Sequence, residues 1–212
     1  KNNFLLSIYK EKENIGFSWL DISTGELFTQ IGNEKDLCPS IARIRPSEIL
    51  IIDNSEMQAL KESIEKLFNL PISSILQNVV NGKKAEKLIC IHYGVKSLSS
   101  FGNFTSNELI ACWSLLEYVS MTQKGYFPPI GFPSSIKSNT SMMIDVSTRK
   151  SLEISENLAG NKKGSLISAV NKTLTSVGAR KLYEDISAPL TDIKKINSRL
   201  DMVSFFIESN HS

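Results

Sequence analysis

Three acidic residues lie at positions where a protein could hold metal ions. Asp21 closes the apolar run 15–22, Glu26 opens the run 26–31, and Asp53 closes the run 48–53. Clustered carboxylates of this kind bind two divalent metals in many nucleases, where the metals position the attacking water and the leaving group. Metal-dependent cleavage of a phosphodiester is therefore one function that these residue types offer.

A turn gives Asp21 a simpler role. Asp21 is followed by Ser23, Thr24 and Gly25, and an Asp side chain commonly accepts hydrogen bonds from nearby backbone N–H groups. Gly25 supplies the positive φ that a short hairpin loop needs. Nucleases with a ribonuclease H-like fold carry an acid on their first strand, and the first strand-like run here, residues 4–9, has none. The hairpin interpretation is favoured, and the nuclease built on Asp21, Glu26 and Asp53 stays as the alternative.

Basic residues offer a second chemistry, contact with phosphate. The loop 160–165 contains Gly, Lys and Ser, but its two lysines precede the second glycine, whereas a phosphate-binding loop has the lysine after it. Basic doublets elsewhere could contact nucleic acid and give salt-dependent binding. They are Lys83-Lys84, Lys162-Lys163, Arg180-Lys181 and Lys194-Lys195. No aromatic residues interleave with these doublets, so solvated surfaces are favoured and a DNA-binding module is a further alternative.

Cysteine and histidine give little support for other catalysis. The three cysteines, Cys38, Cys90 and Cys112, are far apart and next to apolar residues, which predicts reduced, buried thiols and fits a cytoplasmic protein. The two histidines, His92 and His211, are too few for most histidine-based sites. No catalytic, cofactor-binding or metal-binding residue is therefore predicted. The net charge of +2 excludes a whole-chain basic field for DNA, and no apolar run is long enough to span a membrane.

The elements that position these residues divide into two kinds. Runs 4–9, 15–22 and 26–31 predict an antiparallel meander, residues 34–43 predict a helix, and the continuous apolar run 48–53 predicts a buried parallel strand. Ser55 with Gln58 and Thr105 with Glu108 match the capping-box pattern at the start of helices. A strand over 71–77, a short helix over 85–93 and an enclosed helix over 105–122 complete an α/β domain.

Residues 125–140 change in character, with Pro128, Pro129 and Pro133 excluding a helix or central strand. We predict a first domain over residues 1–124, a linker over 125–140 and an all-helical domain over 141–212. Helices are expected from Ser147, over 165–174, from Thr175 to about Ile186, and from Asp192 onward. The last of these has an apolar stripe at helical spacing, which consists of Ile193, Ile196, Leu200, Val203 and Ile207.

Several segments resemble one family, the MutS-type DNA mismatch repair proteins. WLDISTGELF (residues 19–28) and ARIRPSEILIID (42–53) resemble its connector domain. MIDVSTRKSLEI (143–154), TSVGARKL (175–182) and APLTDIKKINSRLDMV (188–203) resemble the start of its core, or lever, domain. The resemblance covers essentially the whole chain and is weakest over about residues 71–107.

The resemblance implies a fold and a role. It implies a ribonuclease H-like connector without nuclease activity, joined to part of a helical core, in a fragment that relays conformational change and offers a docking surface to a MutL-type partner. Whole family members are dimeric ATPases that use ATP and Mg²⁺ and bind mismatched DNA. The resemblance does not extend to their mismatch-reading and ATPase parts. Phe206-Ile207-Glu208 matches the Phe-x-Glu motif of mismatch readers, but it lies in an amphipathic pattern and is interpreted as part of a helix.

The sequence starts with Lys1, and its last residues continue a helical pattern, so we expect an excised fragment with an exposed stripe over 193–207.

Two residues of the second domain suggest specific structural roles. Gly178, inside a helical stretch, is explained by close approach of another helix or by a local break. Arg149 is a candidate for a buried ion pair that ties the linker to the helices.

Overall fold

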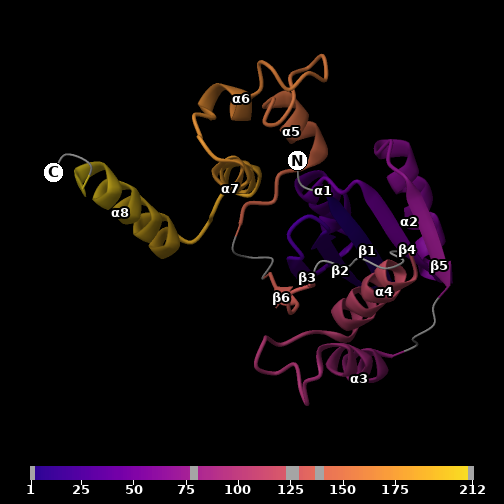
Figure 1. Cartoon of the computed structure of the whole chain (residues 1–212). Helices are drawn as coiled ribbons and strands as arrows, with labels where there is room; N and C mark the ends of the chain where they lie inside the picture. The colour runs from indigo at the N-terminus through magenta and orange to yellow at the C-terminus, as the bar shows by residue number, and fades with distance from the viewer. Residues whose placement is uncertain (1–2, 77–80, 123–128, 137–140, 210–212) are drawn as a thin grey trace. The chain divides into compact units, whose positions relative to one another are not determined.

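The chain folds into two compact units, residues 1–137 and 138–212. The computed structural model describes residues 3–76, 81–122, 129–136 and 141–209, and Figure 1 traces them. No helix within these ranges is long and apolar enough to cross a membrane.

A six-stranded sheet forms the centre of the first unit. Its strands are β1 Phe4–Glu11, β2 Asn14–Asp21, β3 Leu27–Gly32, β4 Glu48–Asp53, β5 Ile72–Leu76 and β6 Ser134–Ser135. The strand order is β5-β4-β1-β2-β3-β6. β1, β2 and β3 pair antiparallel, whereas β4 pairs parallel with both β1 and β5. The predicted meander and the predicted buried parallel strand are both confirmed.

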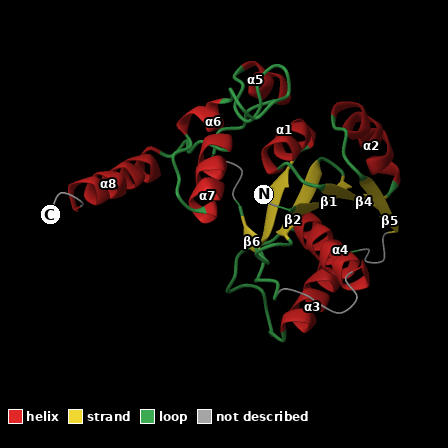
Figure 2. Cartoon of the chain, turned by 45° about the horizontal axis from the view of Figure 1, so that its top comes forward, coloured by secondary structure: helices red, strands yellow, loops and turns green. Residues whose placement is uncertain are grey.

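Helices cover both faces of this sheet, as Figure 2 shows. They are α1 Glu34–Ile44, α2 Ser55–Leu67, α3 Gly82–Tyr93 and α4 Ser106–Thr122. Leu50 and Ile52 of β4 pack with α3 and α4, while Ile49 and Ile51 pack with α1 and α2. Successive side chains of a strand point to opposite faces, so a strand covered on both sides must be apolar at every position.

Asparagine, rather than serine, is the N-cap of three of these helices. Asn54 is the N-cap of α2, and its side chain accepts a hydrogen bond from the Met57 N–H at 2.9 Å. The predicted capping box of Ser55 and Gln58 is therefore wrong, because Asn54 occupies the cap and Ser55 is already the first helical residue. Asn33 caps α1 and Asn81 caps α3 in the same way. The predicted pairing of Thr105 with Glu108 at the start of α4 is confirmed, with the Thr105 N–H 2.9 Å from Glu108 Oε2.

The segment 129–136 differs from the predicted linker. β6 pairs parallel with β3 at the edge of the sheet, and Gly131 N–H donates to the Gly25 carbonyl at 2.9 Å. These residues lie within the first unit, so the boundary between units falls after Lys137 rather than at residue 124. The remaining parts of the predicted linker, 125–128 and 137–140, lie outside the described residues.

The second unit is helical, as predicted. Its helices are α5 Val146–Ser151, α6 Leu166–Val170, α7 Ser176–Ser187 and α8 Ile193–Ser209. α6 is shorter than the predicted helix over 165–174, because the Asn171 side chain accepts from the Thr173 N–H and turns the chain away. The stripe on α8 is solvent-exposed at its larger apolar positions, and Phe206 is exposed there as well.

Gly178 lies in the first turn of α7, where its N–H donates to the Thr175 hydroxyl at 3.1 Å. The atoms nearest to a Cβ added at Gly178 would belong to Thr173 and Thr175, at 3.1–3.6 Å, and not to another helix. The close approach of another helix is therefore not found in the described structure, and the glycine instead occupies a tight capping turn.

Gly16 provides a test of how α4 is seated on the sheet. A Cβ at this position would lie 2.2 Å from the Asn107 carbonyl oxygen and 2.7 Å from the Glu108 backbone nitrogen, at the start of α4. Because backbone cannot give way as a flexible side chain can, Gly16→Ala is expected to lower the free energy of unfolding by about 1–3 kcal/mol in urea titrations. Gly131→Ala is the control, since its nearest contact would be 3.5 Å, and equal effects from both would contradict this packing.

Candidate functional site

The Asp21 side chain shapes the β2–β3 hairpin. It is 2 % exposed, and its Oδ1 accepts a hydrogen bond from the Ser23 N–H at 2.8 Å. The Asp21 carbonyl accepts from Thr24 and Gly25, and Gly25 has φ 77°. Glu26 is exposed and accepts from the Thr24 hydroxyl at 3.1 Å. The predicted hairpin role of Asp21 is confirmed.

The sheet register separates the acids of the alternative nuclease site. Asp21 pairs with Phe4 at the start of β1. Ile51 pairs with Ile8, so Asp53 lies level with Lys10, near the other end of β1. Six residues of strand span roughly 20 Å, which is far more than one metal centre can bridge. Within the described residues, no three His, Cys, Asp or Glu side chains cluster in a way that could hold a metal ion.

Two of the three cysteines are buried, as the sequence predicts. Cys90 and Cys112 are buried, whereas Cys38 is partly exposed. Burial raises the pKa of Cys112 to about 12, so this thiol stays protonated and unreactive at neutral pH. His92 lies edge-on to Tyr93 with ring centroids 4.8 Å apart, and His211 lies outside the described residues.

The basic doublets are divided between the two units. Lys83 and Lys84 lie exposed on α3 in the first unit, whereas the other three doublets belong to the second. Lys181 contacts Asp185 at 3.1 Å and so is partly neutralised. The loop 160–164 leads into α6, a helix of only five residues, and does not have the spacing of a phosphate-binding loop.

Sequence reasoning missed the second role of Glu108. This carboxylate is 1 % exposed, and while Oε2 caps α4, Oε1 accepts hydrogen bonds from the Thr29 hydroxyl at 2.9 Å and the Ser135 hydroxyl at 3.2 Å. The Thr105 hydroxyl also donates to Oε2 at 2.9 Å. One side chain thus joins α4, β3 and β6, and these partners satisfy the buried charge by hydrogen bonding.

A cluster of aromatic side chains lies at the end of α3. We define the α3 surface by the side chains of Tyr93, Phe101 and Phe132. Phe101 and Phe132 stack with centroids 3.9 Å apart, and Tyr93 lies 4.7 Å from Phe132. The Tyr93 hydroxyl donates to the Gly131 carbonyl at 2.8 Å, and burial raises its pKa above the ordinary value.

Phe132 makes this surface available for contact. It is 41 % exposed, although it is strongly apolar and lies against Phe101 and Tyr93. Exposed apolar residues that lie beside other apolar residues mark contact sites more often than single ones do. No local pattern of the sequence predicts this surface, because it is assembled from a helix, a loop and the segment before β6.

In the second unit, Arg149 connects two helices. Its guanidinium donates a hydrogen bond to the Ser187 carbonyl at the end of α7. A helix end leaves carbonyl groups without intrahelical partners, and a cationic donor suits them. Arg149 therefore ties α5 to α7. The buried ion pair that would tie the linker to the helices stays a prediction.

Comparison with known families accounts for nearly all of the chain. The family MutS domain II matches residues 3–131, and the family MutS domain III matches residues 147–212. These two matches meet near the boundary between the two compact units.

Comparison with individual proteins agrees with these families. The DNA mismatch repair protein MutS of Wolbachia pipientis wMel is 37% identical over 211 residues, which cover 100% of this chain and 25% of that protein. The same-named protein of Anaplasma phagocytophilum (strain HZ) is 38% identical over 212 residues, covering 100% and 26%. That of Rickettsia africae (strain ESF-5) is 39% identical over 206 residues, covering 96% and 23%. The chain therefore spans about a quarter of the length of these curated relatives.

Removal of the Glu108 carboxylate tests its role as a junction. Glu108→Ala leaves the hydroxyls of Thr29, Ser135 and Thr105 without their acceptor, so urea titration should show a loss of about 3 kcal/mol in unfolding free energy. Glu108→Gln should lose less unfolding free energy, because the Thr29 and Ser135 hydroxyl oxygens can also accept hydrogen bonds from the amide N–H groups of glutamine. Glu65→Ala, at an exposed position on α2, should change stability by less than about 0.5 kcal/mol, and a similar value for Glu108→Ala would refute the junction.

The raised pKa of Cys112 predicts a loss of stability in alkali. The ordinary thiol ionises near pH 9, so between pH 9 and about 12 the unfolded state binds fewer protons than the folded state. The free energy of unfolding then falls as pH rises, by about 1.4 kcal/mol per pH unit from this group. Urea titrations of Cys112→Ala should show a shallower decline over the same range, whereas an identical decline in both proteins would contradict the assignment.

Proposed function

Because this chain belongs to the MutS family, we propose that it forms the connector and the first part of the core of a DNA mismatch repair protein. The first unit would be the connector and the second the start of the core. The two family matches, which divide the chain near residue 137, support this assignment.

We further propose that the connector has a ribonuclease H-like fold without its catalysis. The strand arrangement supports the fold, since three antiparallel strands are followed by two parallel strands that add beside β1. β1 has its one acid, Glu11, at its exposed last position, and Asp21 is widely separated from Asp53; both observations support a non-catalytic role for this chain. ATP hydrolysis with Mg²⁺, homodimer formation and binding of mismatched DNA are proposals for the whole protein, as is its place in the cytoplasm.

The role proposed for the two units is mechanical relay combined with partner docking. The connector would pass conformational change between the DNA-binding and ATPase ends, and it would offer a surface to a MutL-type protein. The observation that carries the docking proposal is the α3 surface of Tyr93, Phe101 and Phe132, in which Phe132 is exposed. Aromatic residues are enriched where proteins bind one another, because they bury a large area at low entropic cost.

Calorimetric titration with the MutL-type protein of the same organism tests the docking proposal. The unmodified chain is expected to bind, and Phe132→Ser should weaken binding at least about fivefold, which corresponds to the loss of a contact worth 1 kcal/mol or more. Phe132 is 41 % exposed, so its replacement should leave the fold intact.

Leu67→Ser on α2 is the control, since Leu67 is also an exposed large apolar side chain, at 56 % exposure, outside the α3 surface. Equal weakening by both substitutions would show that the α3 surface is not the docking site. Absence of binding by the unmodified chain would remove the docking proposal itself.

A further inference from the structure

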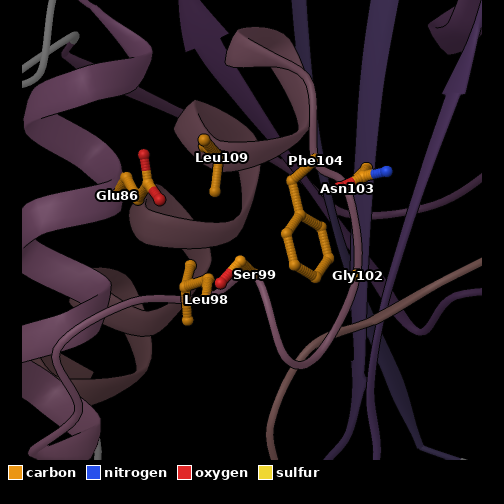
Figure 3. A pocket seen from close by; sticks show the side chains of 7 residues that line it. All are labelled: Glu86, Leu98, Ser99, Gly102, Asn103, Phe104 and Leu109. Atoms are coloured by element: carbon orange, nitrogen blue, oxygen red, sulfur yellow. The ribbon is translucent and has the colours of Figure 1, made fainter.

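A small open cavity lies between α3, the start of α4 and the loop that joins these helices. Figure 3 shows Glu86 on one side of it and the Phe104 ring on the other, with Leu98 and Leu109 between them. Its volume is about 190 Å³, whereas pockets for small organic ligands usually have roughly 300–1,000 Å³. The cavity therefore has the size for a single long side chain rather than for a cofactor.

The Glu86 carboxylate determines which side chain suits the cavity. Glu86 is only partly exposed, and no described residue donates a hydrogen bond to it or forms an ion pair with it. A carboxylate that has lost part of its hydration and has no protein partner is favourably matched by a cation with N–H donors. The unpaired carboxylate therefore points to a positively charged occupant.

The other walls favour arginine over lysine. A planar guanidinium can donate two parallel hydrogen bonds to one carboxylate and can also lie against an aromatic ring, and here Glu86 and Phe104 face each other across the cavity. Leu98 and Leu109, which are 1 % and 7 % exposed, form an apolar wall for the methylene stem. We propose that this cavity docks an arginine side chain of a protein partner, an inference that rests on the proposed docking function.

The surroundings restrict the sequence next to that arginine. Lys83, Lys84 and Lys87 are exposed on the same helix as Glu86. They would repel further positive charge, so the arginine must be flanked by neutral or acidic residues in the partner. The cavity thus selects an isolated arginine in an acidic segment and disfavours a polybasic one.

The cavity can be tested without the partner by nuclear magnetic resonance. Titration of the ¹⁵N-labelled chain with N-acetyl-arginine methylamide should shift the backbone amides of Ser99, Gly102 and Asn103 in a saturable way. The citrulline analogue has the same shape without the charge, and it should not produce these shifts. Glu86→Gln should abolish the arginine response, whereas Glu65→Gln on α2 should retain it. Equal responses to both compounds, or an unchanged response in Glu86→Gln, would overturn the proposal.

Titration with the MutL-type protein then tests the natural occupant. Glu86→Gln is expected to weaken binding at least tenfold and Glu65→Gln to leave it unchanged. Equal binding by Glu86→Gln and the unmodified chain would overturn the arginine-docking role while leaving the docking function in place. Failure of the unmodified chain to bind would instead overturn the docking function, and the arginine titration would still decide whether the cavity recognises a guanidinium.

Discussion

The seating of α4 against β2 and β3 is the constraint on which the first unit depends. Gly16 lets the backbone of β2 approach the first turn of α4, and Glu108 in that turn binds the Thr29 hydroxyl of β3. If β2 and α4 approached closely without the Thr29 hydrogen bond, the buried Glu108 carboxylate would lose a partner. If they did not approach closely, the Thr29 hydroxyl would lie beyond hydrogen-bond distance of Glu108. Together they bring Leu109 and Leu116 onto the sheet.

The same contact determines where the candidate surface lies. α3 packs on α4, and Tyr93 near its end holds Gly131 through a hydrogen bond, while Glu108 holds Ser135 four residues further on. The segment 129–136 is thus fixed near both of its ends to elements that α4 positions. Phe132 lies within this segment, so a protein that bound the α3 surface would contact the part of the first unit that precedes the second unit in the chain. This connectivity is a physical basis for combining docking with relay.

Local patterns in the sequence predicted most of this fold, whereas contacts between distant residues escaped prediction. The buried run 48–53 and the helix over 105–122 follow from apolar spacing, which is visible within a few residues. The cap formed by Thr105 and Glu108 was predicted for the same reason. Thr29 and Ser135 share the Glu108 carboxylate through folding alone, since 79 and 27 residues separate them from it, and β6 has no pattern of its own. The cavity at Glu86 likewise requires a loop whose course no spacing rule predicts.

Exposed apolar area alone does not distinguish a docking surface, and the second unit illustrates why. The large apolar residues of α8, such as Leu200 and Phe206, are exposed, and no described residue of α8 is buried. Most helices in proteins are stabilised by packing of their apolar side, and α8 lacks this packing among the described residues. The apolar side of α8 is therefore explained by the need to stabilise the helix, without a docking function. Phe132 is different, because hydrogen bonds of Gly131 and Ser135 already hold the segment around it, and its ring is still 41 % exposed. Exposure of an apolar side chain in a segment that is already held in place supports the proposal that the α3 surface is a docking site.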